Sequence, residues 1–151
     1  MLIYILYLWI WCFKMKILSI IIILFFTLTL QAEDIAVVVS SKFKSDTLQK
    51  SDVNRIFLAK SNRINNKKIK IIELKNSSYK DVFYKKVLNK TQSQLHSYWS
   101  RLIFTGKANP PKQVESLDIL LKKMAENKLI VTYLPVSMVT SEMKILYTLK
   151  N

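Results

Sequence analysis

The sequence predicts an α/β fold in which helices pack on a mostly parallel sheet. Short apolar runs rich in β-branched residues alternate with segments whose apolar residues recur at helical spacing. Their order along the chain is strand, helix, strand, three helices and two strands. Strands joined through helical connections favour this layered arrangement.

Four apolar runs are predicted to be strands. The first, residues 35–39, is apolar throughout and ends at a pair of serines, which is typical of a strand covered on both faces. The second follows a polar loop, and the last two close the chain. These three runs are residues 68–74, 129–134 and 144–149.

Four segments are predicted to be helices, because their apolar residues recur at i, i+3 and i+4. Each begins near a side chain that can cap it: Ser51, Ser78 with Asp81, Thr91 with Gln94, and Ser116. The first helix extends to about Lys60, and Gly106 with two prolines keeps residues 105–111 a loop. The predicted core face carries Leu95, Trp99, Leu102, Leu117, Leu120 and Leu121.

The composition excludes several classes of protein. The chain contains one Gly, one Cys and one His. A dinucleotide fingerprint, a phosphate-cradling loop and an EF-hand each need glycine at fixed offsets, so a single glycine excludes them. A structural zinc site needs four Cys or His ligands. We therefore expect no cofactor and no metal.

The chain is strongly basic, with 24 Lys and Arg against 10 Asp and Glu and a net charge of +14. Such a charge suits polyanions, nucleic acid among them. The richness in Lys, Ile and Asn also fits a compositional bias that leaves lysines on a solvated surface. We expect no nucleic-acid partner, because the amino terminus directs the chain out of the cytoplasm.

The amino terminus has the layout of a signal peptide. Residues 17–30 are almost entirely apolar, follow a lysine and lead to Ala32 and an acidic pair. We predict cleavage after Ala32, a true start at Met15, and a single domain at residues 33–151. The alternative is a tandem membrane anchor that starts at Met1. The mature protein would contain no cysteine and would need no disulfide.

Four stretches of the chain, residues 48–60, 73–79, 98–111 and 129–134, resemble motifs of one family. That family is the substrate-binding proteins of phosphate ABC transporters, which have a type II periplasmic-binding-protein-like fold. Residues 48–60 resemble the "L…I..IFLGK" signature of that family. Residues 73–79 stand where the family has an Arg-Ser-x-Gly-Ser-Gly-Thr phosphate turn, and residues 129–134 where it has "GAIGY". Residues 98–111 are similar to the "YW.r.iFtG…pP" stretch of its small single-lobe relatives. The resemblance implies a single periplasmic-binding-protein-like lobe.

The chain also departs from the family pattern. Ala59 replaces a motif glycine, and the arginine and glycines of the phosphate turn are absent. Leu129 and Thr132 stand where the last motif has glycines. A full binding protein of this family closes two lobes on its ligand, and this chain supplies only one. The resemblance therefore implies weak ligand binding.

Polar residues that follow the first two strands form a candidate anion site. Ser40 and Ser41 follow strand one, and Ser77 and Ser78 follow strand two beside Lys75. Ligands of open α/β sheets bind beyond the strand carboxyl ends, where helix amino termini present unpaired N–H groups. The alternative is that Ser77 or Ser78 only caps its helix.

Three functions remain open, and none is enzymatic, because nothing in the sequence assembles a nucleophile, a base and an oxyanion hole. The first is a periplasmic protein that binds a small inorganic anion such as phosphate, with an ABC transporter as partner. The second is an envelope interaction module that has lost the ligand site. The third is a basic protein that binds anionic lipid or polymer. For the first two, membrane contact is expected only through the signal segment or an uncleaved anchor.

Overall fold

The computed structural model describes residues 9, 11, 13, 14, 33–75 and 77–150. The chain divides into two units, Met1–Ala32 and Glu33–Asn151, and the second unit contains the sheet and its helices. The predicted signal peptide, residues 1–32 with a true start at Met15, lies outside the described residues except for positions 9, 11, 13 and 14, and it stays a prediction. Within the described ranges, no helix is long and apolar enough to cross a membrane.

A five-stranded sheet forms the centre of the lobe, in the order β5-β4-β6-β1-β7. Its strands are β1 (Ile35–Ser40), β4 (Lys70–Leu74), β5 (Lys112–Val114), β6 (Ile130–Pro135) and β7 (Met143–Leu149). β4 pairs in parallel with β5 and β6, whereas β1 runs antiparallel to β6 and β7. Four strands therefore share one direction, and the predicted mostly parallel α/β sheet is confirmed.

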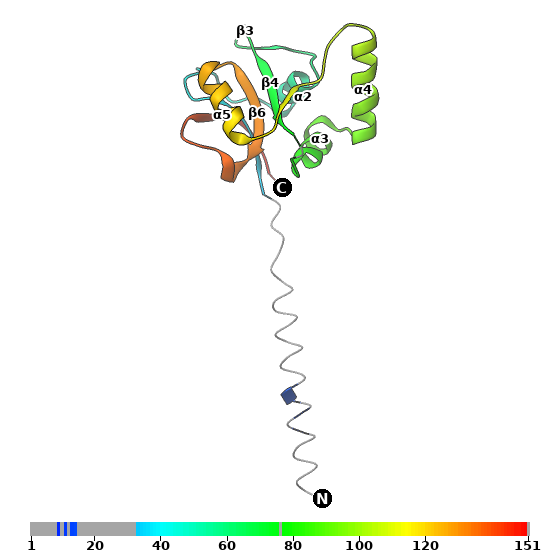
Figure 1. Ribbon diagram of the computed structural model, residues 1–151, viewed down its shortest axis with the longest axis vertical. Helices are drawn as coiled ribbons and strands as arrows, with labels where there is room; N and C mark the ends of the chain where they lie inside the picture. Colours follow the sequence, from blue (N-terminus) through cyan, green and yellow to red (C-terminus); the bar gives the residue numbers. More distant parts are fainter. Residues whose placement is uncertain (1–8, 10, 12, 15–32, 76, 151) are drawn as a thin grey trace, which may run out of the picture. The chain divides into compact units, whose positions relative to one another are not determined.

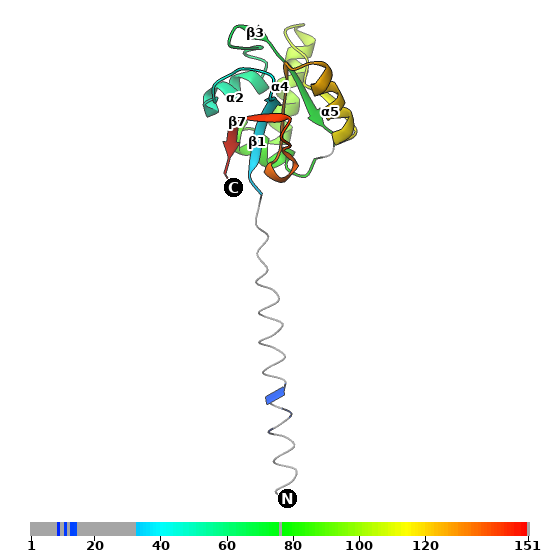
Figure 2. The same ribbon diagram turned by 90° about the vertical axis from the view of Figure 1, so that its left-hand side faces the viewer.

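Helices cover both faces of the sheet (Figures 1 and 2). The helices are α2 (Lys50–Phe57), α3 (Lys80–Leu88), α4 (Gln92–Phe104) and α5 (Leu117–Glu126), with a short 3-10 turn η1 (Val136–Met138). Figure 2 shows α2 and α5 on opposite sides of β1. Every residue of β1 is buried, as predicted for a strand covered on both faces.

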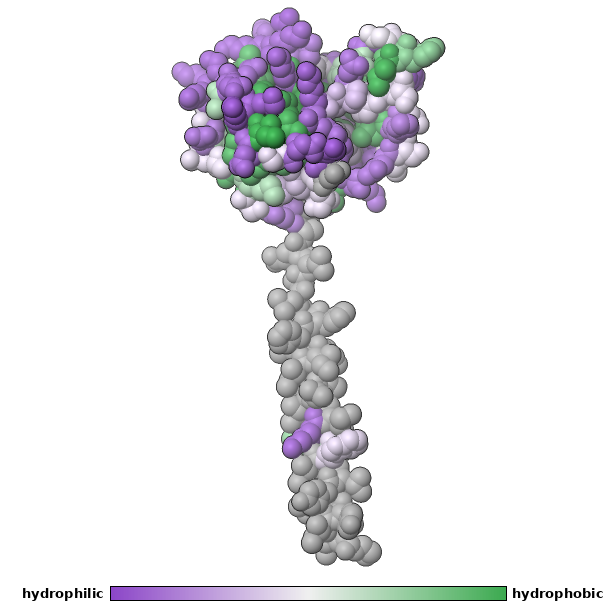
Figure 3. Space-filling view, viewed as in Figure 1, coloured by the Kyte–Doolittle hydropathy of each residue, from purple (hydrophilic) through white to green (hydrophobic). Residues whose placement is uncertain are grey.

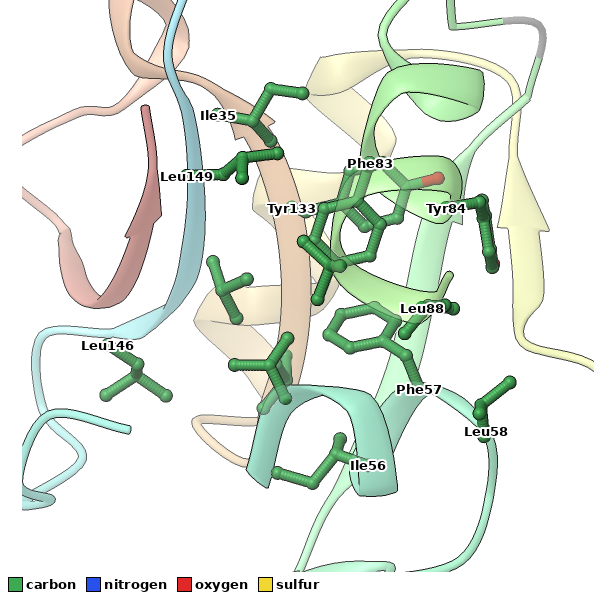
Figure 4. Packing of buried hydrophobic residues seen from close by; sticks show 14 of the residues in the cluster. Ile35, Ile56, Phe57, Leu58, Phe83, Tyr84, Leu88, Tyr133, Leu146 and Leu149 are labelled. Carbon is green, nitrogen blue, oxygen red and sulfur yellow. The ribbon is translucent and has the colours of Figure 1, made fainter. Parts of the chain in front are cut away.

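Alternate residues of β1 supply two separate hydrophobic clusters. Ile35, Val37 and Val39 join the larger cluster, beneath α2, α3 and α4. Ala36 and Val38 join the smaller cluster with the inner side of α5. Figure 4 shows part of the larger cluster. Successive strand side chains point to opposite faces, so one apolar strand can anchor both layers.

The predicted core face of the later helices is partly confirmed. Leu95, Trp99 and Leu120 are buried. Leu102, Leu117 and Leu121 are only half-buried and pack at the margins of the two clusters.

Two helix starts differ from the prediction. α2 begins after Gln49, whose N–H donates to Asp52 Oδ2 at 3.2 Å, and it ends at Phe57 instead of Lys60. Ala59 then adopts a left-handed φ of 53°. α3 begins after Tyr79, and no side-chain hydrogen bond caps it, so the predicted Ser78–Asp81 cap does not form.

Two short pairings were not predicted. β2 (Arg63–Ile64) and β3 (Lys67–Lys68) form a small hairpin in the region expected to be a polar loop. Asn65 and Asn66 form its turn with positive φ, a conformation that asparagine tolerates better than most residues. β5 lies in residues for which no element was predicted, directly after the predicted loop 105–111, and it pairs with β4.

Candidate functional site

The carboxyl edge of the sheet, where β4 and β6 end and α3 begins, gathers several buried polar side chains. Glu73 comes from β4, Tyr133 from β6 and Tyr84 from α3. Ser77 and Tyr79 lie in the connection that leads into α3. Ligands bind preferentially at this edge in open α/β sheets, because helix amino termini converge there.

Glu73 lies between Ile72 and Leu74 in β4, and it is only 1% exposed. Its Oε1 accepts a short hydrogen bond from the Tyr84 hydroxyl, and its Oε2 lies 3.4 Å from the Lys80 Nζ. Burial raises the pKa of this carboxyl above its ordinary value, while Tyr84 and Lys80 act in the opposite direction. Glu73 and Lys80 therefore form a buried acid beside a half-buried cation.

Three hydroxyl groups beside this pair have no hydrogen-bond partner among the described residues. They belong to Ser77, Tyr79 and Tyr133. The Ser77 hydroxyl lies near both tyrosines, without ordinary hydrogen-bond geometry to either. Burial is the main cause that raises the pKa of both tyrosines, so both stay protonated donors at physiological pH. Buried hydroxyls of this kind are costly unless something pairs with them.

This edge opens into a hollow of about 840 Å³ between α3 and α4. Ser77, Ser78 and Tyr84 are among the residues that line this hollow, and Gln113 of β5 lines it as well. The charged side chains along the hollow are mostly basic: Lys80, Lys85 and Lys90, against Asp81. An anion that enters would therefore meet more positive than negative charge.

The arrangement suits recognition of an anion more than chemistry on it. A helix amino terminus, serine hydroxyls and an ammonium group are donors that stabilise negative charge. Glu73 opposes this, because its carboxylate already accepts from the same ammonium. In the part of the chain that the structure describes, no three His, Cys, Asp or Glu side chains come together as a metal site would require.

Known structures share this fold. The lobe matches an ABC-type phosphate transport receptor from Vibrio cholerae with a TM-score of 0.57 and 15% identity, over 76% of this chain and 45% of the receptor. A phosphate-bound substrate-binding protein from Clostridium perfringens gives 0.57 and 11%, over 76% and 44%. PstS from Borrelia burgdorferi gives 0.55 and 14%, over 76% and 46%. The predicted resemblance is confirmed at the level of the fold.

These similarities establish the fold of the lobe and do not identify its ligand. The chain spans less than half the length of the binding proteins it matches. No protein-family model and no curated protein matches it. What its site binds has to be argued from its own residues.

The structure separates the two predicted serine pairs. β1 is antiparallel to β6, with Ile35 opposite Pro135, whereas β4 is parallel to β6, with Lys70 opposite Ile130. Ser40 therefore lies at the end of the sheet where β4 begins. It lines a different hollow with Ser41, against α5. The expectation that Ser40 and Ser41 approach from a neighbouring strand end is wrong, because β1 runs against the other strands.

Ser77 and Ser78 lie where the sequence placed them, at the carboxyl edge and before α3. Ser77 Oγ has no hydrogen-bond partner among the described residues. The N-cap residue of α3 is Tyr79, so the Ser77 side chain does not cap this helix. Lys75 points elsewhere: its Nζ lies 2.9 Å from Glu115 Oε1 in an exposed ion pair.

Sequence reasoning missed the residues that surround the two serines. Glu73 carried a signal, since it lies between Ile72 and Leu74 in the predicted strand, and a carboxyl is buried there only at a cost. Lys80 and Tyr84 lie one helical turn apart, which places both on the side of α3 that faces Glu73. Tyr133 matches a family motif, but that match assigns its hydroxyl no role.

Proposed function

We propose that this chain is an exported single-lobe protein that binds a small inorganic anion such as phosphate, weakly, at the start of α3. The observation that supports this most is the Ser77 hydroxyl, which lines the hollow with Lys80 and lacks a partner among the described residues. A tetrahedral oxyanion there accepts from Ser77 and Ser78 and from the first amides of α3. Lys80 supplies a positive charge.

Weak binding follows from Glu73. The incoming anion competes with a buried carboxylate for the Lys80 ammonium. Among the described residues that line the hollow there is no arginine to offer the bidentate contact that strengthens phosphate recognition. We expect dissociation constants in the millimolar range, which corresponds to about −4 kcal/mol of binding free energy.

Titration with inorganic phosphate tests this proposal, by calorimetry and by amide chemical shifts. The wild type should show shifts at residues 77–81, and replacing both Ser77 and Ser78 by Ala should weaken binding. Glu73→Gln should strengthen it, because the change removes the competing charge and releases Lys80. Replacing Lys122 and Lys123 of α5 by Gln is the matched control for net charge, and these two changes should leave binding unaltered.

Two outcomes would reject the site. If the wild type gives no heat and no shift at millimolar phosphate, anion binding fails and the envelope interaction module takes its place. If the α5 lysine variant weakens binding as much as the serine variant, the anion is attracted by the overall positive charge of the lobe and not by the proposed site.

The folds of known phosphate-binding proteins support an ABC transporter as partner and the periplasm as location. We propose no catalytic activity.

A further inference from the structure

The carboxyl end of α4 exposes two adjacent large apolar side chains. Phe104 is 92% exposed and Ile103 is 51% exposed. Helical spacing explains the exposure of Phe104, which lies on the opposite side of α4 from the buried Leu95 and Trp99. Ile103 lies one turn after Trp99, at the rim of the hollow between α3 and α4. Figure 3 shows the resulting hydrophobic surface at the upper right, over the end of α4 seen in Figure 1.

Basic residues surround this apolar end. Gly106 turns the chain with a left-handed φ of 64°, and the Lys107 N–H then donates to the Leu102 carbonyl at 2.9 Å, which holds Lys107 beside the last turn. Arg101 lies one turn before Phe104, 5.9 Å from the centre of the Tyr98 ring. We call Arg101, Ile103, Phe104 and Lys107 the α4 tip.

No acidic residue offsets this charge locally. The 33 residues from Val82 to Val114 contain six Lys and Arg and no Asp or Glu. Among the described residues, neither Arg101 nor Lys107 makes an ion pair. A solvent-exposed aromatic side chain inside a purely basic segment is typical of surfaces that meet anionic lipid.

We infer that the α4 tip docks on an anionic lipid bilayer, with Phe104 and Ile103 entering the interface and Arg101 and Lys107 contacting the headgroups. Size favours lipid over a folded protein partner, since a stable protein interface buries roughly 800 Å² on each side. Two apolar side chains at a helix end supply little of that area. A second copy of this chain is disfavoured by its own positive charge. Ile103 also lines the hollow of the phosphate site, but the inference does not require phosphate binding, and it adds a membrane contact through the lobe itself.

Hydrogen exchange of the full chain in bilayer nanodiscs tests the inference. Discs of phosphatidylcholine alone are compared with discs that also contain phosphatidylglycerol, so the amino-terminal segment meets a bilayer in both. Amides of residues 101–108 should exchange more slowly on the anionic discs only. Raising the salt from about 0.1 to 1 M, which shortens the Debye length from about 10 to 3 Å, should remove the difference.

Three variants test separately the aromatic contact, the basic residues and an exposed apolar residue elsewhere on the lobe. Phe104→Ser should abolish the protection, and because the side chain is exposed, the melting curve should not change. Replacing Arg101 and Lys107 by Gln should abolish the preference for anionic discs. Ile119→Ser on α5, another exposed apolar residue, should have no effect. Protection that is absent, equal on both discs, or retained by Phe104→Ser would overturn the inference, and a search for an acidic protein partner would follow.

Discussion

The hydroxyl of Tyr133 should cost the unliganded lobe stability. The Tyr133 ring stacks on Phe83 with centroids 4.0 Å apart and meets the edge of Phe57 at 5.6 Å (Figure 4). The side chain is almost fully buried, and its hydroxyl has no hydrogen-bond partner among the described residues. Tyr133→Phe keeps every ring contact and removes only that oxygen. Because an unpaired buried polar group costs about 1–3 kcal/mol, the free energy of unfolding should rise by about that amount.

Tyr84→Phe is the matched control, because it removes the same atom from a neighbouring ring with the opposite expectation. The Tyr84 hydroxyl donates to Glu73, which would stay buried and lose a donor. Hydrogen bonds to charged groups contribute about 1.5–3 kcal/mol, so this variant should be destabilised by about that much. Urea unfolding, followed by tryptophan fluorescence, measures both changes, and equal m-values would show that the unfolded states are comparable. Changes of the same sign would refute the assignment of paired and unpaired hydroxyls.

Three further predictions concern the helix end, the buried acid and the amino terminus. Ala59 has a φ of 53° at an exposed position, so Ala59→Gly should raise the free energy of unfolding by about 1 kcal/mol in the same urea experiment, and a loss would contradict the left-handed assignment. Burial raises the pKa of Glu73 above its ordinary 4.5, so the folded state binds a proton more tightly than the unfolded state. Stability should therefore fall as pH rises from 4.5 through the raised pKa, and Glu73→Gln should flatten that fall in melts across pH. Amino-terminal sequencing of protein from the cell envelope should begin at Glu33, and any upstream start would contradict cleavage.

Local chemistry made much of the fold predictable from sequence. Thr91 and Gln94 form the predicted capping box, with the Thr91 N–H donating to Gln94 Oε1 at 3.0 Å. Ser116 accepts from the Ile119 N–H and starts α5 as expected. Each of these signals lies within four residues of the element that it sets. The apolar runs behave likewise, since a continuous run such as β1 has to be buried on both faces.

Pairing between distant segments was not predictable in the same way. β5 has three residues, Lys112–Val114, and no apolar alternation, so its strand conformation comes from pairing with β4. The direction of β1 depends on partners almost a hundred residues away. The antiparallel direction of β1 removes Ser40 from the candidate site, because it places Ser40 and Ser77 at opposite edges of the sheet. The sequence predicted Ser77 and Ser78 at this edge and did not predict Glu73, Lys80 or Tyr84 beside them.

Glu73 connects the fold of the lobe with the weak anion binding that we propose. The fold depends on apolar faces, which tolerate wide sequence change, and it is matched at 11–15% identity. The proposed anion site depends on a few charged groups at one sheet edge, where a single acid changes the balance of charge. Glu73 accepts from Tyr84 and lies within 3.4 Å of Lys80, so the lobe carries its own anion next to the cation that a ligand would need. Without a ligand, that carboxylate keeps the half-buried ammonium and the buried phenol partnered. A bound anion would have to share the Lys80 ammonium with Glu73. Its affinity would therefore be lower than at a site where the ammonium is unpaired.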